Sequence, residues 1–167
     1  MKTLFLVRHA KSDRDGLGAM LEDIDRPLNE RGYNNAHLMS NILKEKKHLP
    51  DMIITSPAIR ALTTALIFAR NFKYSPKNIM IEEGIYHGTT ENYIKAVQKA
   101  GDSYRSVMLF GHNPTITAAC NHLNTFFIDH IPTTGIACID LKISDWQELD
   151  NDTKGELRFM DFPKNHI

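Results

Sequence analysis

The sequence predicts an α/β protein of three layers, in which helices cover both faces of a mostly parallel central sheet. Short continuous apolar runs, typical of strands buried on both faces, alternate with segments of helical periodicity over most of the chain. The last two apolar runs have only a polar stretch between them and resemble a hairpin. Because 167 residues suffice for one hydrophobic core, we expect a single domain over residues 1–167.

The expected elements follow one another in a regular order. Apolar runs that predict strands cover residues 3–7, 52–54, 79–81, 107–110, 136–141 and 157–162. Helical spacing predicts helices over residues 30–46, 58–72, 91–100 and a segment from 114 through 123. Residues 11–29 show no clear period and predict a long loop, and long loops in compact domains are often functional.

Polar residues stand before three of these helices, where a side-chain oxygen can accept a free backbone N–H. We expect Asn29 to cap the first helix. We expect Ser56 to cap the second, with Pro57 at its first position. By the same argument, Asn113 is expected to cap the last helix, with Pro114 at its first position.

Composition excludes several classes of protein. Hydrophobic residues make up 42% and charged residues 24%, which excludes a disordered or fibrous chain. Lys plus Arg and Asp plus Glu both number 20, so charge gives no reason to expect nucleic acid as a partner. Cys120 and Cys138 form no disulfide framework, and no segment has the length of a signal-peptide core or a membrane span. We therefore expect a cytoplasmic protein without a membrane partner.

Three motifs follow predicted strands and carry groups suited to phosphate chemistry. They are Arg8-His9, then Ser56-Pro57 with Arg60, then Gly111-His112-Asn113. Ligands of open parallel sheets bind beyond the carboxyl ends of the strands, so these motifs are expected to meet in space. Two of them also precede helices, whose free N–H groups favour anions. The sequence therefore predicts a phosphate clamp at this edge of the sheet.

The two arginines and two histidines of these motifs suggest a metal-independent phosphoryl transfer. Guanidinium groups bind phosphate oxygens through paired hydrogen bonds. Nearby positive charge lowers the pKa of an imidazole, which keeps His9 neutral and nucleophilic. Attack of His9 on phosphorus gives a phosphohistidine that water hydrolyses, while Arg8, Arg60 and His112 stabilise the charge on the phosphoryl oxygens.

Other polar clusters are given no role. The acidic stretch Glu22–Asp25 lacks the spacing of a calcium loop and is expected to be solvated. Six further histidines lack metal-ligand spacing: His37, His48, His87, His122, His130 and His166.

Across nearly its whole length, the chain resembles the histidine phosphatase superfamily, and within it the short SixA-type phosphohistidine phosphatases. Residues 6–12, Leu-Val-Arg-His-Ala-Lys-Ser, look like that group's Arg-His signature. Residues 25–32 look like the block after the first loop, and residues 56–61 are similar to the segment that carries a second phosphate-binding arginine. Residues 111–114 are similar to the segment that carries a second histidine, and Trp146, Gly155 and Pro163-Lys164 agree with the subgroup's tail.

The resemblance implies a phosphoglycerate mutase-like fold, no cofactor and no metal. It implies His9 as the nucleophile and Arg8, Arg60 and His112 as phosphate ligands. Arg26 and Asn113 are expected as further phosphate-binding residues. Many superfamily members also use a Glu or Asp in the third βα loop as a general acid. Glu83 is the nearest candidate here, with Glu82 beside it, but the residues that follow do not match the mutase pattern.

These observations predict a phosphatase whose substrate is a phosphorylated protein, with phosphohistidine the favoured bond, or a small phosphorylated molecule. One alternative is a mutase-like enzyme or small-molecule phosphomonoesterase of the same superfamily, although the chain leaves little room for insertions that would enclose a sugar phosphate. A second is a non-catalytic module that binds phosphorylated partners with the same clamp.

Overall fold

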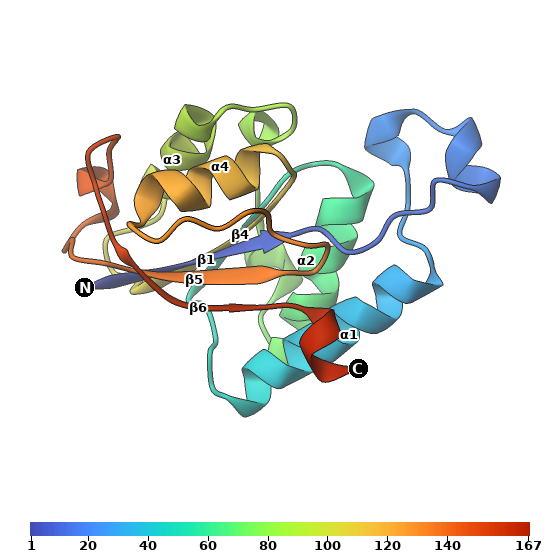
Figure 1. The fold of residues 1–167 in the computed structure, drawn as a ribbon, viewed down its shortest axis with the longest axis horizontal. Coiled ribbons are helices and arrows are strands. Elements are labelled where there is room, and N and C mark those ends of the chain that lie inside the picture. The colour runs from blue at the N-terminus through green and yellow to red at the C-terminus, as the bar shows by residue number, and fades with distance from the viewer.

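A computed structural model describes all 167 residues and contains one six-stranded sheet flanked by four α-helices (Figure 1). The strands are β1 (Lys2–Arg8), β2 (Met52–Thr55), β3 (Met80–Ile81), β4 (Ser106–Gly111), β5 (Ile136–Leu141) and β6 (Glu156–Asp161). The helices are α1 (Glu30–Glu45), α2 (Ile59–Phe72), α3 (Thr90–Gln98) and α4 (Thr115–Leu123). The predicted alternation of strands and helices is confirmed.

The sheet has the order β3-β2-β4-β1-β5-β6. The first four strands of this order pair in parallel, whereas β5 pairs antiparallel with both β1 and β6. The three-layer α/β class with a mostly parallel sheet is therefore confirmed, as is the closing hairpin. Because β1 and β4 are adjacent and parallel, Arg8 stands opposite Gly111 where both strands end.

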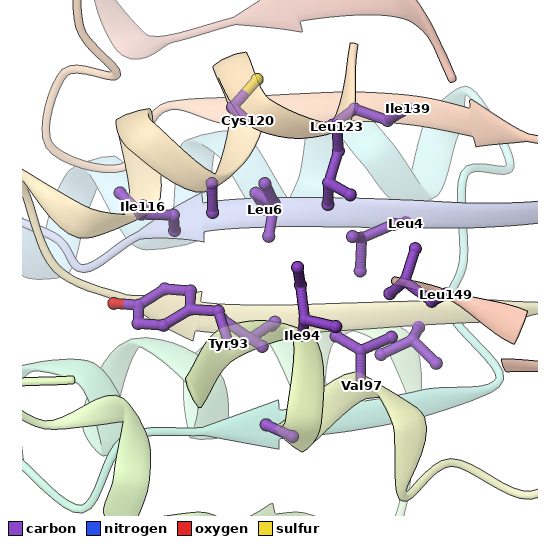
Figure 2. Close-up of a cluster of buried hydrophobic side chains, with 14 of the residues drawn as sticks. Leu4, Leu6, Tyr93, Ile94, Val97, Ile116, Cys120, Leu123, Ile139 and Leu149 are labelled. Atoms are coloured by element: carbon purple, nitrogen blue, oxygen red, sulfur yellow. The ribbon is translucent and has the colours of Figure 1, made fainter. Parts of the chain in front are cut away.

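Alternate residues of the central strands supply two cores, one on each face of the sheet. Leu4 and Leu6 of β1 point towards α3 and α4, where they belong to one buried cluster with Ile94, Val97 and Ile116 (Figure 2). The intervening Phe5 and Val7 pack with α1 and α2 residues such as Met39 and Phe68. Both faces of β1 are thus buried, which explains why its sequence is continuously apolar.

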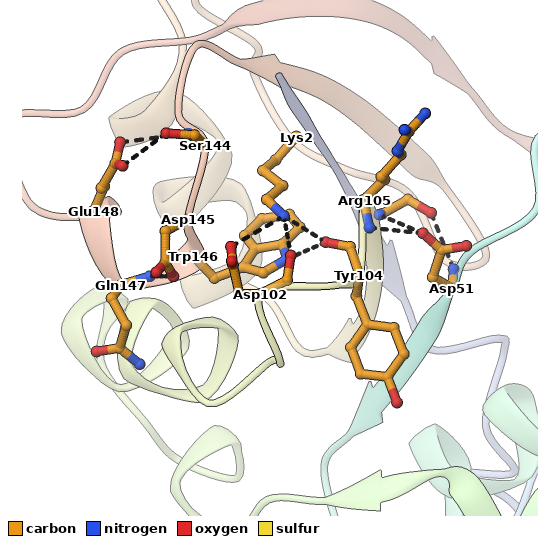
Figure 3. Close-up of polar contacts among 11 residues, drawn as sticks. Lys2, Asp51, Asp102, Tyr104, Arg105, Ser144, Asp145, Trp146, Gln147 and Glu148 are labelled. Carbon is orange, nitrogen blue, oxygen red and sulfur yellow. Dashed lines mark hydrogen bonds and ion pairs between the residues drawn. The ribbon is translucent and has the colours of Figure 1, made fainter.

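Polar contacts fix the edge of the sheet where β1 and β4 begin (Figure 3). The buried Lys2 ammonium donates to the carbonyls of Asp102, at 2.6 Å, and Tyr104, at 2.8 Å. The indole N–H of Trp146 also donates to the Tyr104 carbonyl, at 2.8 Å. These bonds tie the loop before β4 to the start of β1, at the edge opposite the strand ends that carry the three motifs.

Two predicted helix caps are wrong, although Asn29 does cap α1 by accepting the N–H of Gly32 at 2.8 Å. Helix α2 begins at Ile59, so Pro57 precedes it, and Ser56 instead accepts the N–H of Ala58 in a turn before the helix. Helix α4 begins at Thr115, after Pro114. The Asn113 side chain instead binds the Ile131 carbonyl and the Thr117 hydroxyl.

None of the helices combines the length and apolar character that a membrane crossing requires.

Candidate active site

A cleft of about 420 Å³ lies at the carboxyl ends of β1, β2 and β4, where the three motifs meet. It brings together six of the seven residues that the sequence suggested for the site: Arg8, His9, Arg26, Arg60, His112 and Asn113. The seventh, Glu83, is exposed in the turn Glu83–Ile85 and does not line the cleft. Convergence of the strand ends therefore accounts for the composition of the site.

The backbone around His9 is held from several sides. The His9 N–H donates to the Gly111 carbonyl at 3.1 Å, and the Ala10 N–H donates to Thr64 Oγ1 at 3.0 Å. Thr64 Oγ1 itself donates to the Arg60 carbonyl at 2.7 Å, which links the first turns of α2 to the end of β1. Thr64 follows Arg60 by four residues and therefore lies on the same face of α2. This one face supplies both the arginine and the hydroxyl that accepts the Ala10 N–H.

The ring of His9 is fixed in a definite tautomer. Its Nδ1 lies 2.7 Å from the carbonyl oxygen of Ala10. Because a carbonyl can only accept, Nδ1 carries the proton and Nε2 of the neutral ring keeps its lone pair. Burial is the main cause that lowers the pKa of His9 to about 3. The bond to Ala10 acts to raise this pKa, whereas the neighbouring His112, Arg60 and Arg8 lower it further. At neutral pH, His9 therefore presents an uncharged nucleophilic nitrogen.

His112 lies beside His9, with ring centroids 5.2 Å apart. Its Nε2 lies 2.8 Å from Ser56 Oγ, and its backbone N–H donates to the hydroxyl of Tyr93 at 2.9 Å. Gly111 permits this approach, because a Cβ there would come within 2.5 Å of the Tyr93 hydroxyl oxygen. Burial, followed by the charge of Arg60, lowers the pKa of His112 to about 4.

These lowered pKa values predict that the free energy of unfolding decreases as the pH falls below about 6.5, the pKa of an unperturbed imidazole. The unfolded chain then takes up protons at His9 and His112 that the native state cannot bind. His9→Gln should remove about 2 kcal/mol from the loss of stability between pH 7 and pH 5. Urea unfolding at both pH values checks this. His130→Gln, at an exposed histidine, is the matched control, and an equal loss in His9→Gln and the wild type would contradict the expectation.

Three buried nitrogen atoms of the site have no hydrogen-bond partner: Arg8 Nε, Arg60 Nε and His112 Nδ1. Ser56 Oγ accepts the Ala58 N–H and also lies within hydrogen-bond distance of His112 Nε2. Arg8 Nε and Arg60 Nε are N–H donors without protein acceptors. An unpaired buried donor costs free energy, and guanidinium groups match the oxygens of an oxyanion.

Asp23 belongs to this site, which corrects the expectation that the acidic stretch 22–25 is merely solvated. Its backbone carbonyl accepts Arg60 Nη1 at 2.7 Å, and its carboxylate accepts Arg60 Nη2 at 3.0 Å and the Tyr86 hydroxyl at 2.7 Å. Arg26 Nη1 pairs with the other carboxylate oxygen at 2.8 Å. Partial burial opposes ionisation of Asp23, yet the bonds from Tyr86 and Arg60 hold its pKa below the ordinary value.

Three further residues line the cleft although the sequence did not suggest them for the site. The ring of Tyr86 lies edge-on to His112, with centroids 5.7 Å apart, and that of His87 lies 4.0 Å from Tyr86. Arg14, in the loop before α1, also lines the cleft. No motif marks these positions, because the loops that carry them have no periodicity.

The sheet, with its basic cleft at the parallel strand ends, defines an α/β protein whose cleft lies at the topological position typical of ligand binding. Residues 4–89 match the family model of the histidine phosphatase superfamily (branch 1), and the chain belongs to this superfamily.

Similar proteins support the SixA-type subgroup that the motifs suggested. A structure from Agrobacterium tumefaciens, described as a candidate phosphohistidine phosphatase SixA, has a TM-score of 0.78 and 26% identity, covering 97% of this chain and 98% of that one. The protein histidine phosphatase SixA complexed with tungstate has a TM-score of 0.81 at 22% identity, covering 98% of both chains. An uncharacterized protein of Mycobacterium tuberculosis is 28% identical over 144 residues, 80% of this chain and 85% of that protein.

Proposed function

We propose that this protein is a phosphatase that accepts a phosphoryl group on His9 Nε2 and hydrolyses it, with phosphohistidine on a protein as the substrate. One observation carries the proposal: the Ala10 carbonyl holds the proton of His9 on Nδ1, which leaves Nε2 as a nucleophile in a cleft lined by Arg8 and Arg60, whose Nε groups have no protein partner. Membership of the histidine phosphatase superfamily supports the reaction class.

The reaction proceeds in two displacements at phosphorus. In the first, the lone pair of His9 Nε2 forms an N–P bond while the bond from phosphorus to the substrate breaks, and the leaving group keeps that electron pair. In the second, a water oxygen attacks the phosphohistidine, the N–P bond breaks, and inorganic phosphate leaves with neutral His9 restored. In both, Arg8, Arg60 and His112 stabilise the negative charge on the phosphoryl oxygens.

The absence of a positioned carboxylic acid from the cleft favours phosphohistidine over an alkyl ester. Asp23 is the one carboxylate that lines the cleft, and Arg60, Arg26 and Tyr86 keep it ionised. An alkoxide leaving group needs protonation in the transition state, an effect worth about 10² to 10⁴ in rate. An imidazole that carries a proton on its remote nitrogen leaves as a neutral molecule and needs no such acid.

Glu83→Gln is accordingly expected to change the turnover of a phosphohistidine protein by less than about twofold, because the Glu83 side chain is exposed and lies outside the cleft. Steady-state kinetics from pH 6 to 8 check this. Glu82→Gln serves as the control on the same loop, since its carboxylate pairs with Lys99 at 2.9 Å. A large, pH-dependent loss in Glu83→Gln alone would make Glu83 the general acid and favour ester substrates.

The substrate class itself is tested by comparing kcat/KM over phosphohistidine proteins, sugar phosphates and aryl phosphates. We expect the phosphohistidine proteins to give the highest values. A preference for sugar phosphates would support the mutase-like or small-molecule alternative. Absence of turnover on every substrate, with inorganic phosphate still bound, would indicate a binding module and overturn the proposed activity.

A further inference from the structure

Four arginines line the cleft, and one of them differs from the others in having no partner. Arg8 donates to the Ile131 carbonyl at 3.1 Å, Arg26 pairs with Asp23 at 2.8 Å, and Arg60 pairs with Asp23 at 3.0 Å. Arg14 lines the same cleft but makes no side-chain hydrogen bond and no ion pair. Its guanidinium fork is therefore open to a ligand.

The charges of the cleft do not balance with a phosphoryl group alone. Four guanidinium groups face one carboxylate, Asp23. A phosphoryl dianion compensates two of the remaining three positive charges, and one stays unmatched. Both Arg8 and Arg14 line the cleft, and burial and then the charge of Arg14 lower the pKa of Arg8. A second anion beside Arg8 would relieve this repulsion.

Hydrogen bonds of the neighbouring Asp13 hold the turn that contains Arg14. The Asp13 N–H donates to the Pro27 carbonyl at 2.8 Å, and the Asp13 carboxylate accepts the N–H groups of Asp15, at 3.1 Å, and Gly18, at 3.3 Å. A side chain at Gly18 would not fit, because its Cβ would lie 1.8 Å from the Asp13 carbonyl oxygen. These contacts on both sides of Arg14 fix the backbone that carries it at the edge of the cleft.

We propose that Arg14 binds a second anionic group of the substrate, next to the phosphoryl group held by Arg8 and Arg60. The chemistry is that of a carboxylate on a planar guanidinium fork. This inference rests on the proposed function, and on a protein substrate it assigns an acidic side chain beside the phosphohistidine. Arg14 is then a specificity residue that distinguishes acidic from neutral surroundings of the phosphoryl group.

The test uses two small probes of similar size, phosphoglycolate, which carries a carboxylate, and ethyl phosphate, which does not. Binding to the His9→Ala protein is measured by calorimetry, so that neither probe turns over. Phosphoglycolate should bind more tightly than ethyl phosphate, and adding Arg14→Gln should reduce this preference about tenfold, the loss of one charge-assisted hydrogen bond. Arg70→Gln, an exposed arginine in the last turn of α2, is the control and should leave the preference unchanged.

Each outcome decides between the two proposals. A preference for phosphoglycolate that Arg14→Gln leaves intact, or no preference at all, overturns the second-anion site while the phosphate site stands. Failure of both probes to bind overturns the phosphate site and this inference together. Loss of the preference in Arg14→Gln supports the second-anion site. If the wild type hydrolyses none of the tested substrates, that result counts against the proposed activity and leaves the second-anion site standing.

Discussion

His9→Ala is expected to abolish turnover, by on the order of 10⁴-fold or more in kcat, while leaving phosphate binding largely intact. The reason is that His9 Nε2 combines a free lone pair, a lowered pKa and a place in the cleft. The donors that we propose for the phosphoryl oxygens belong to other residues, Arg8, Arg60 and His112. The variant should therefore bind inorganic phosphate or vanadate with an affinity within about tenfold of the wild type.

Trapping the intermediate identifies the nucleophile directly. The wild-type protein, quenched during turnover of a labelled substrate, should carry phosphate that is lost in acid and retained in alkali, as a phosphoramidate behaves. The His9→Ala protein should carry none. A label that survives acid would move the nucleophile to a hydroxyl, and Ser56, whose Oγ lies 2.8 Å from His112 Nε2, would be the first residue to examine.

The positions of the main site residues could be predicted because they depend on topology. Arg8, Ser56 and His112 each stand at or just after the end of a parallel strand, and the registers of β1, β2 and β4 bring those ends together. A short apolar run is enough to locate such a strand end in a sequence. Helical spacing then places Arg60 in the first turn of the helix that follows, so the sequence alone indicates four residues that line the cleft: Arg8, His9, Arg60 and His112.

The contributions of Asp23, Tyr86 and Arg14 could not be predicted, since loop geometry determines them. Asp23 lies 37 residues from Arg60 and 63 from Tyr86 in sequence, and no periodicity relates these positions.

The two wrong predictions of helix caps have a related cause. Ser56 and Asn113 have the right chemistry to cap a helix, but Ser56 contacts His112 and Asn113 contacts Ile131, so tertiary contacts outweigh the local preference.

Arg60→Ala is expected to lower kcat/KM by roughly 10²-fold, equivalent to about 3 kcal/mol of transition-state stabilisation, the usual loss when one preorganised donor is removed. Arg60 is preorganised because Asp23 holds both of its terminal nitrogens, at 2.7 and 3.0 Å, which leaves the buried Nε without a protein partner. Arg60→Lys should recover only part of the loss, since an ammonium cannot both bind Asp23 through a fork and direct further donors at the phosphoryl group.

A matched pair of variants separates the charge of Arg60 from its positioning. Asp23→Asn keeps an acceptor for the Tyr86 hydroxyl and leaves Arg60 charged. We therefore expect a smaller fall in kcat/KM than in Arg60→Ala. Because Asp23 aligns Arg60 for the transition state, the change should be mainly in kcat. Arg70→Ala, ten residues further along the same helix and exposed, should have no effect. The kinetics are to be compared at equal folded fractions, determined from thermal unfolding. Wild-type kcat/KM in Arg60→Ala would remove Arg60 from the phosphate clamp. A loss in Asp23→Asn as large as in Arg60→Ala would show that the charge of Arg60 has no effect unless Asp23 positions it.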